Sequence, residues 1–110
     1  MSGAELAGSL REQVTILRRA PGRDAIGGAN GDWIALGTRP AAVIPARPGA
    51  TVQGDTLAGV PRWLVTMRNE GALPEPGDRI AWRDRRLMVR FAEADPRRPD
   101  RVVAGTEEER

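Results

Sequence analysis

The sequence contains no cysteine, histidine, lysine or tyrosine. Without cysteine there is no disulfide and no thiol nucleophile, and without histidine the usual general base and the ordinary zinc sites are excluded. No apolar run approaches the roughly 20 residues that span a bilayer, and residues 1–8 lack the basic and apolar stretches of a secretory signal. We therefore expect a protein with no membrane segment that is made and used in a cytoplasm.

Aromatic residues are scarce, at 4% of the 110 residues, while hydrophobic residues make up 40%. A chain of this length fits one domain with a single core. The large side chains of that core must be the three tryptophans and Phe91, with Trp63 and Trp82 inside strand patterns and Trp33 closing one end of the fold. A core this lean favours a subunit that is completed by assembly into an oligomer.

Positive charge comes from arginine alone: 17 basic residues face 15 acidic ones, and the net charge is +2. Such a balance gives little long-range attraction for nucleic acid. Exclusive use of arginine is typical of a GC-rich genome, and we prefer that explanation to selection for guanidinium groups.

Short strands separated by turns account for most of the pattern. The chain has 13 glycines and 9 prolines, and hydrophobic residues alternate along several short runs. The predicted strands are residues 12–18, 33–47, 60–68, 79–82, 86–91 and 100–105. Two long loops, 21–31 and 48–59, interrupt them. The sequence thus predicts one all-β domain over residues 1–110, a small antiparallel β-barrel or sandwich with little helix and flexible termini at about 1–9 and 107–110.

Three local features carry their own expectations. Pro40 and Pro45 interrupt the second strand, which predicts a bent or bulged strand or an edge strand. The acidic tail from Thr106 to Arg110 is expected to fray. The hairpin after Trp82 is expected to turn around Arg83, Asp84 and Arg85.

Candidate catalytic groups do not cluster. The aspartates mostly stand beside glycine or proline, where aspartate caps turns. The glycine-rich run 27–31 lacks the lysine and the strand–helix setting of a phosphate-binding loop. The sequence therefore favours a protein that is not an enzyme, with no cofactor and no metal site.

Six arginines surround two predicted turns and have two interpretations. If the turns lie side by side, these residues form a basic rim that contacts phosphates or an acidic partner. If not, they are solvated turn residues paired with nearby carboxylates, and the balanced charge favours this second interpretation. The six are Arg83, Arg85, Arg86, Arg97, Arg98 and Arg101.

The order of the elements resembles the phage head-tail adaptor and head-closure (stopper) family, which includes the stopper proteins of gene transfer agents. The resemblance covers about residues 10–107 and depends on order and spacing. Three departures are a proline at 40, Arg85 where the family's turn usually has glycine, and Met88 where an aromatic is common. Arg85 would be strained if its φ is positive. The matching segments are Leu10–Ile16, Asp32–Trp33, Ala42–Arg47, Trp63–Arg68, Gly77–Trp82 and Arg86–Val89.

The resemblance implies a structural subunit of a sixfold or twelvefold ring in the neck of a phage, prophage or gene transfer agent particle, assembled in the cytoplasm of the bacterial host. The ring would close the DNA exit channel and bind a portal-side adaptor protein and a tail terminator or tail tube protein, with DNA passing through without sequence-specific binding. The long loop would face the channel or a neighbouring subunit. Its residues are Pro48, Gly49, Thr51, Gln53, Gly54, Asp55, Thr56 and Gly59.

Two alternatives remain open. A tail terminator or another neck component differs from a stopper only in its partners. A small β-barrel that binds single-stranded nucleic acid would need a positive groove with exposed aromatic side chains, and both the scarcity of aromatics and the balanced charge count against it.

Overall fold

The computed structural model describes residues 8–20, 32–46 and 61–109. Both long loops predicted from the sequence, 21–31 and 48–59, lie outside these ranges. Within the described residues, no helix is long and apolar enough to cross a membrane. The strands are β1 (Glu12–Arg19), β2 (Trp33–Pro45), β3 (Arg62–Arg68), β4 (Arg79–Trp82), β5 (Arg85–Asp95) and β6 (Arg98–Glu108).

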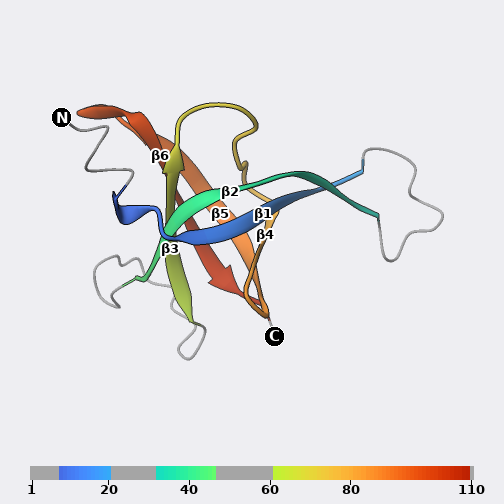
Figure 1. Ribbon diagram of the computed structural model, residues 1–110. Helices are drawn as coiled ribbons and strands as arrows, with labels where there is room; N and C mark the ends of the chain where they lie inside the picture. Colours follow the sequence, from blue (N-terminus) through green and yellow to red (C-terminus); the bar gives the residue numbers. More distant parts are fainter. Residues whose placement is uncertain (1–7, 21–31, 47–60, 110) are drawn as a thin grey trace.

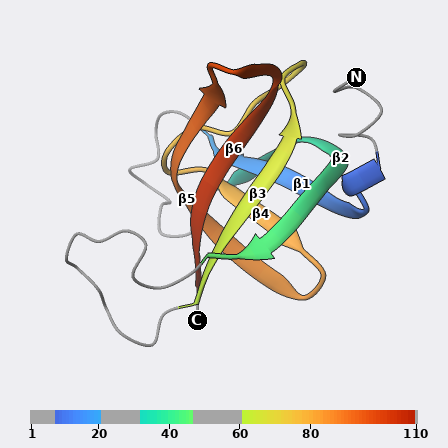
Figure 2. The same cartoon turned by 90° about the vertical axis from the view of Figure 1, so that its left-hand side faces the viewer.

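The six strands close into a barrel in the order β1-β2-β3-β6-β5-β4 (Figure 1). Every neighbouring pair is antiparallel. Figure 2 shows β5, β6, β3 and β2 side by side on the face toward the viewer. The all-β prediction is confirmed, and of the two architectures it left open the chain adopts the barrel.

The core follows from strict alternation along the strands, which sends every second side chain to the interior. The most deeply buried side chains have essentially no exposed surface. Burying one such aliphatic side chain is worth about 1.5–3 kcal/mol, so this cluster is the main source of stability. Its members are Val14, Ile16, Ala41, Val65, Met67, Ile80, Trp82, Leu87, Val89 and Ala104.

β2 is bulged, as predicted, but the bulge lies at Leu36 and not at Pro40 or Pro45, and the strand is not an edge of the barrel because β1 and β3 both pair with it. Ile16 pairs with Gly37 and Leu17 with Ala35, which leaves Leu36 as the extra residue. Gly37 has φ of 147°, a conformation that glycine adopts readily. The strand also changes partner, since residues 33–41 pair with β1 and residues 42–45 pair with β3. Pro40 lies in a half with a strand on one side only, which accommodates a residue without an N–H donor.

Phe91 is not a core residue, contrary to the prediction. Its side chain is on the outer face of β5 and the residue is 45% exposed. A β-bulge between Val89 and Phe91 changes the alternation there. The ring covers Gly105 of β6 so closely that a Cβ on this glycine would lie 2.2 Å from Phe91 Cε2. A glycine opposite an aromatic is a known way to cover the backbone of a sheet.

The C-terminal segment is also ordered where the sequence predicts fraying. β6 continues to Glu108, and Glu109 N–H donates to the Arg86 carbonyl at 2.8 Å. Each of three glutamates faces an arginine on another strand, a long-range match that local composition does not reveal. The ion pairs are Glu107 with Arg62 (3.5 Å) and Arg90 (3.9 Å), Glu108 with Arg85 (2.9 Å) and Glu109 with Arg79 (2.9 Å).

Candidate functional site

Two tryptophans close one end of the barrel. Trp63 lies at the start of β3 and Trp82 at the end of β4, and these two strand ends meet at the same end of the barrel. The rings of Trp63 and Trp82 meet edge to face, with centroids 4.8 Å apart and planes at 61°. Trp82 is buried and Trp63 packs against the core, so the prediction for both holds. We call this region the tryptophan end; its residues are Glu12, Trp63, Trp82, Arg83, Arg85 and Glu108.

Each indole of the tryptophan end donates its N–H to a carboxylate. Trp82 Nε1 donates to Glu12 Oε1 at 3.0 Å, and Trp63 Nε1 donates to Glu108 Oε1 at 3.1 Å. The hydrogen bond from Trp82, followed by those from the Arg83 guanidinium, holds the pKa of Glu12 below its ordinary value of 4.5. The indole N–H of the buried Trp82 therefore has its hydrogen-bond acceptor within the protein.

The same two carboxylates bind the arginines of the β4–β5 turn. Arg83 donates to both Glu12 oxygens, at 3.2 and 2.8 Å, and its guanidinium lies 4.9 Å from the centroid of the Trp82 ring. Arg85 donates to Glu108 at 2.9 and 3.1 Å and lies 5.5 Å from the Trp63 ring. Positive φ falls on Arg83 (56°) and not on Arg85, so the expected strain is two residues earlier in the turn.

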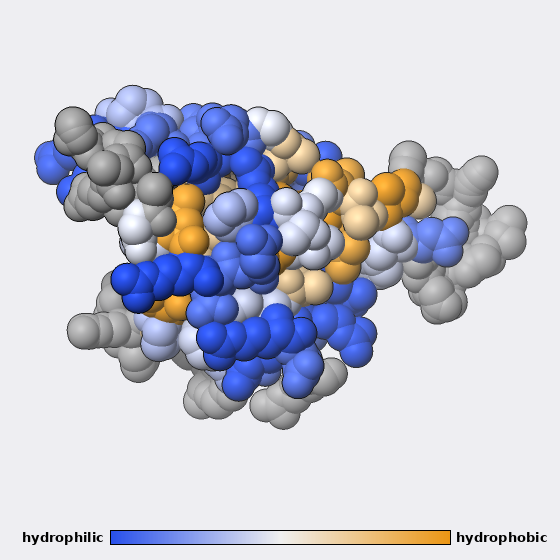
Figure 3. Space-filling model, in the orientation of Figure 1, coloured by the Kyte–Doolittle hydropathy of each residue, from blue (hydrophilic) through white to orange (hydrophobic). Residues whose placement is uncertain are grey.

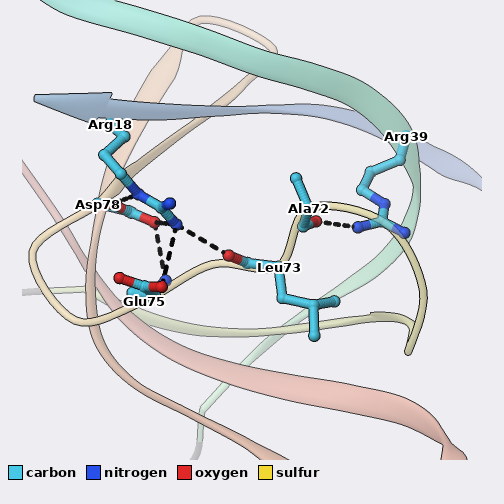
Figure 4. A network of polar contacts seen from close by, with 6 residues as sticks. All are labelled: Arg18, Arg39, Ala72, Leu73, Glu75 and Asp78. Carbon is cyan, nitrogen blue, oxygen red and sulfur yellow. Dashed lines mark hydrogen bonds and ion pairs between the residues drawn. The ribbon is translucent and has the colours of Figure 1, made fainter. Parts of the chain in front are cut away.

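The opposite end is closed by the connector between β3 and β4, residues 69–78 (Figure 4). Arg18 of β1 donates to both carboxylate oxygens of Asp78, at 3.0 and 2.8 Å, and to the Leu73 carbonyl at 3.0 Å. Asp78 is only 3% exposed and also accepts the Glu75 N–H at 2.8 Å. Its carboxylate raises the pKa of Arg18, and a bidentate contact of this kind fixes both partners.

A second arginine holds the same connector from β2. Arg39 donates to the backbone carbonyls of Ala72, Glu70 and Arg68. A small pocket lies where this side chain crosses from β2 to Ala72, with Ile16 in its wall. We call this region the connector end; its polar residues are Arg18, Arg39, Glu75 and Asp78.

The connector end was not predicted as a unit. Asp78 beside Gly77 was expected to stabilise a turn, and its bond to the Glu75 N–H does so. Its ion pair with Arg18, however, joins residues 60 positions apart. No local pattern indicates such a pairing.

Trp33 lies outside the barrel instead of closing an end. Its ring contacts two guanidinium groups, with Arg79 4.2 Å and Arg19 5.0 Å from the ring centroid. Arg79 is itself fixed by Glu109, at 3.0 and 2.9 Å. The third tryptophan therefore anchors the β1–β2 hairpin to the start of β4.

The arginines predicted as partner or phosphate contacts do not form one rim. Arg83, Arg85 and Arg86 lie at the start of β5, whereas Arg97 and Arg98 lie beyond its last residue, at the other end of an 11-residue strand. A strand of that length spans roughly 35 Å. Each group can contact a partner only on its own, and that role stays a prediction.

The individual arginines also differ in their partners. Arg101 is 8% exposed and donates to Asp100 at 3.0 Å, and this contact lowers the pKa of Asp100. Arg83 and Arg85 are bound to glutamates. Arg86, Arg97 and Arg98 are exposed, and in the described part of the chain their side chains have no recorded ion pair. The predicted loop residues from Pro48 to Gly59 fall outside the described ranges.

Among known families, the chain matches the phage head completion protein family over residues 6–106. That range includes nearly the whole barrel, from β1 almost to the end of β6. The chain belongs to this family. No curated protein matches.

Family membership confirms the resemblance drawn from the order of the strands. It assigns the chain a structural role in completing the phage head, as a component of the virion particle. Such a role requires contact with other head or tail proteins. It is a family of structural proteins, in agreement with the prediction of a non-enzymatic chain.

Proposed function

We propose that the chain is one subunit of a ring in the neck of a tailed phage, prophage or gene transfer agent particle, where it closes the DNA exit channel and joins head to tail. The observation that carries the proposal is the family match over residues 6–106. A portal-side adaptor lies on one side of the ring and a tail terminator or tail tube protein on the other.

The structure supports a role based on surfaces. Both barrel ends are filled by internal contacts, with the two tryptophans and their glutamates at one and Arg18 with Asp78 at the other. In the described part of the chain, no group of three or more acidic residues is arranged to hold a metal ion. Within the described residues, the exposed groups available to partners lie on strand faces and in turns.

Binding of single-stranded nucleic acid has less support. Stacking on bases requires aromatic rings with an open face and positive charge beside them. Trp82 is buried, Trp63 packs on it, and two arginine guanidinium groups lie within 5.0 Å of the Trp33 ring centroid. Phe91 lies on Gly105 with one face exposed, which leaves a single ring where a strand-binding groove needs several.

Deletion of the gene, with complementation from a plasmid, tests the proposal. We expect DNA-filled heads without tails, or heads that lose their DNA, and we expect the wild-type gene to restore complete particles. Electron microscopy counts tailed and tailless heads, and nuclease protection measures the DNA retained. Normal tailed particles in the deletion strain would refute the proposal. Heads with DNA and stable necks but tails of abnormal length would indicate a tail terminator instead.

The loop role stays part of the proposal. Replacing residues 48–59 by a short glycine–serine linker leaves all six strands intact. We expect that variant to fold, to enter particles and to fail in retaining DNA. Full DNA retention by the linker variant would remove the loop from the mechanism.

A further inference from the structure

The outer surface of the barrel carries an apolar row that crosses four adjacent strands. Ile44 of β2 is opposite Leu64 of β3, Leu64 is opposite Gly105 of β6, and Gly105 is opposite Phe91 of β5. The neighbours Val43 and Val65 face the core, so Ile44 and Leu64 face outward. Ile44 is 53% exposed and Phe91 is 45% exposed.

A third exposed large apolar residue lies at a different place, on the β1–β2 hairpin. Ile34 is 47% exposed and pairs with Arg18. Residues beyond Leu17 in β1 pair with β2 alone, so the hairpin extends away from the other strands (Figure 1). Figure 3 shows apolar side chains at the surface of this extension. We call it the arm, defined as residues 18–19 and 32–35.

The charges beside the two places are complementary. On the arm, Asp32 is exposed and lies on the same face as Ile34, whereas Arg19 is paired with Trp33 and lies on the opposite face. The row has Glu93 on one side of Phe91 and Arg90 on the other, both exposed. Arg90 makes only a 3.9 Å contact with Glu107, and Glu93 has no side-chain partner recorded in the described residues.

We propose that the arm of one copy of this chain packs on the apolar row of the next copy. Exposed large apolar groups rimmed by polar residues mark sites of protein association. A contact between two different patches is heterologous and repeats from copy to copy, whereas a contact of one patch with itself stops at a dimer. Ile34 covers Ile44 and Phe91, and Asp32, on the same face as Ile34, meets Arg90. The proposal rests on the proposed function, because it supplies the subunit contact of the ring.

The absence of cysteine from the chain makes a direct test possible. In full-length protein, Ile34→Cys and Ile44→Cys are introduced singly and together, and a short bis-maleimide links cysteines that lie near each other. We expect the double variant to give a ladder of dimers, trimers and larger species, and each single variant to remain uncrosslinked. The control pairs Ile34→Cys with Gln13→Cys, an exposed position outside both patches. Circular dichroism checks that every variant folds.

Two results would overturn the proposal. One is a double variant that gives no more product than the Gln13 control. The other is dimers from Ile44→Cys or Ile34→Cys alone, since these indicate a patch that binds itself. The charge contact is tested in the cysteine double variant, where Asp32→Arg or Arg90→Asp is expected to reduce the ladder by up to about fivefold. The two reversals combined restore it.

The outcome is separable from that of the gene deletion. If the crosslinked ladder forms but deletion of the gene leaves normal particles, the contact between copies is retained and the neck role is rejected. A clear deletion phenotype without a ladder would retain the neck role and reject this contact.

Discussion

The two ends of the barrel are closed by different kinds of contact. At the tryptophan end, two large rings pack together and their N–H groups are satisfied by Glu12 and Glu108 near the surface. At the connector end, a buried carboxylate holds a loop against β1. Apolar side chains stabilise the fold as long as they fill the volume of the core. A buried ion pair acts differently, because removing one partner leaves the other buried without its counter-charge. The first end should therefore tolerate charge changes and the second should not.

The largest effect is expected from Trp82→Ala at the tryptophan end. Removing a buried indole leaves a cavity below Trp63, and the expected loss in unfolding free energy is about 3–5 kcal/mol. Urea denaturation measures it. Trp33→Ala is the matched control, since this ring is on the outside and contacts two arginines, and we expect about 1 kcal/mol. Equal losses would mean that the tryptophan end does not close the core.

A smaller but clear loss is expected from Asp78→Ala at the connector end. The change leaves the partly buried Arg18 and the Glu75 N–H without their acceptor, which costs about 2–3 kcal/mol. Glu75→Ala removes only a 3.7 Å contact of an exposed side chain and should cost under about 0.5 kcal/mol. Urea denaturation compares the two. If Glu75→Ala were the more damaging change, the Arg18–Asp78 pair would not be what holds the connector.

The β4–β5 turn provides a third comparison, within the tryptophan end. Arg83 has φ of 56°, which costs a residue other than glycine about 1 kcal/mol. Arg83→Gly and Arg83→Ala lose the same contacts with Glu12 and Trp82, but only glycine relieves the backbone. We expect the glycine variant to unfold at a higher urea concentration than the alanine variant, with an unfolding free energy larger by about 1 kcal/mol. Alanine equal to or better than glycine would argue against a strained turn.

The smallest expected effect is on the acid side of the pH profile. Because the pKa of Glu12 is below 4.5 in the folded protein, the stability it adds is complete above about that pH. It is lost as the pH falls through the folded value, since the unfolded chain takes up the proton first. Glu12→Gln should therefore give a shallower fall in stability between about pH 5 and pH 3. A slope identical to that of the wild type would remove Glu12 from the acid response.

Much of the fold could be predicted from local patterns. Alternation located the strands, and the predicted burial of Trp82 and packing of Trp63 are observed. The predicted bulge in β2 is present, but at Leu36 and not at a proline. Phe91 was misplaced because a bulge at Arg90 reverses which face it occupies. The ordered C-terminus was missed because Glu107, Glu108 and Glu109 are paired with arginines on other strands. Long-range pairing of charges has no local signature.

The candidate surfaces were harder to predict than the fold. The sequence indicated the arginines of the two turns as candidate contacts. Whether the two turns lie close together depends on how far β5 continues past Phe91, and its continuation to Asp95 separates them. The apolar row joins one residue from each of three strands across a glycine in a fourth, so it exists only once the register is fixed. Family membership, by contrast, was accessible from the order of the motifs.

The most direct test of the account is an electron cryomicroscopy reconstruction of the neck of particles that contain this chain. The account predicts a ring between the portal-side adaptor and the tail, each subunit a six-stranded barrel with its β1–β2 hairpin against the β2–β3–β6–β5 face of the next. A neck without this barrel, or the barrel found only elsewhere in the particle, would contradict it.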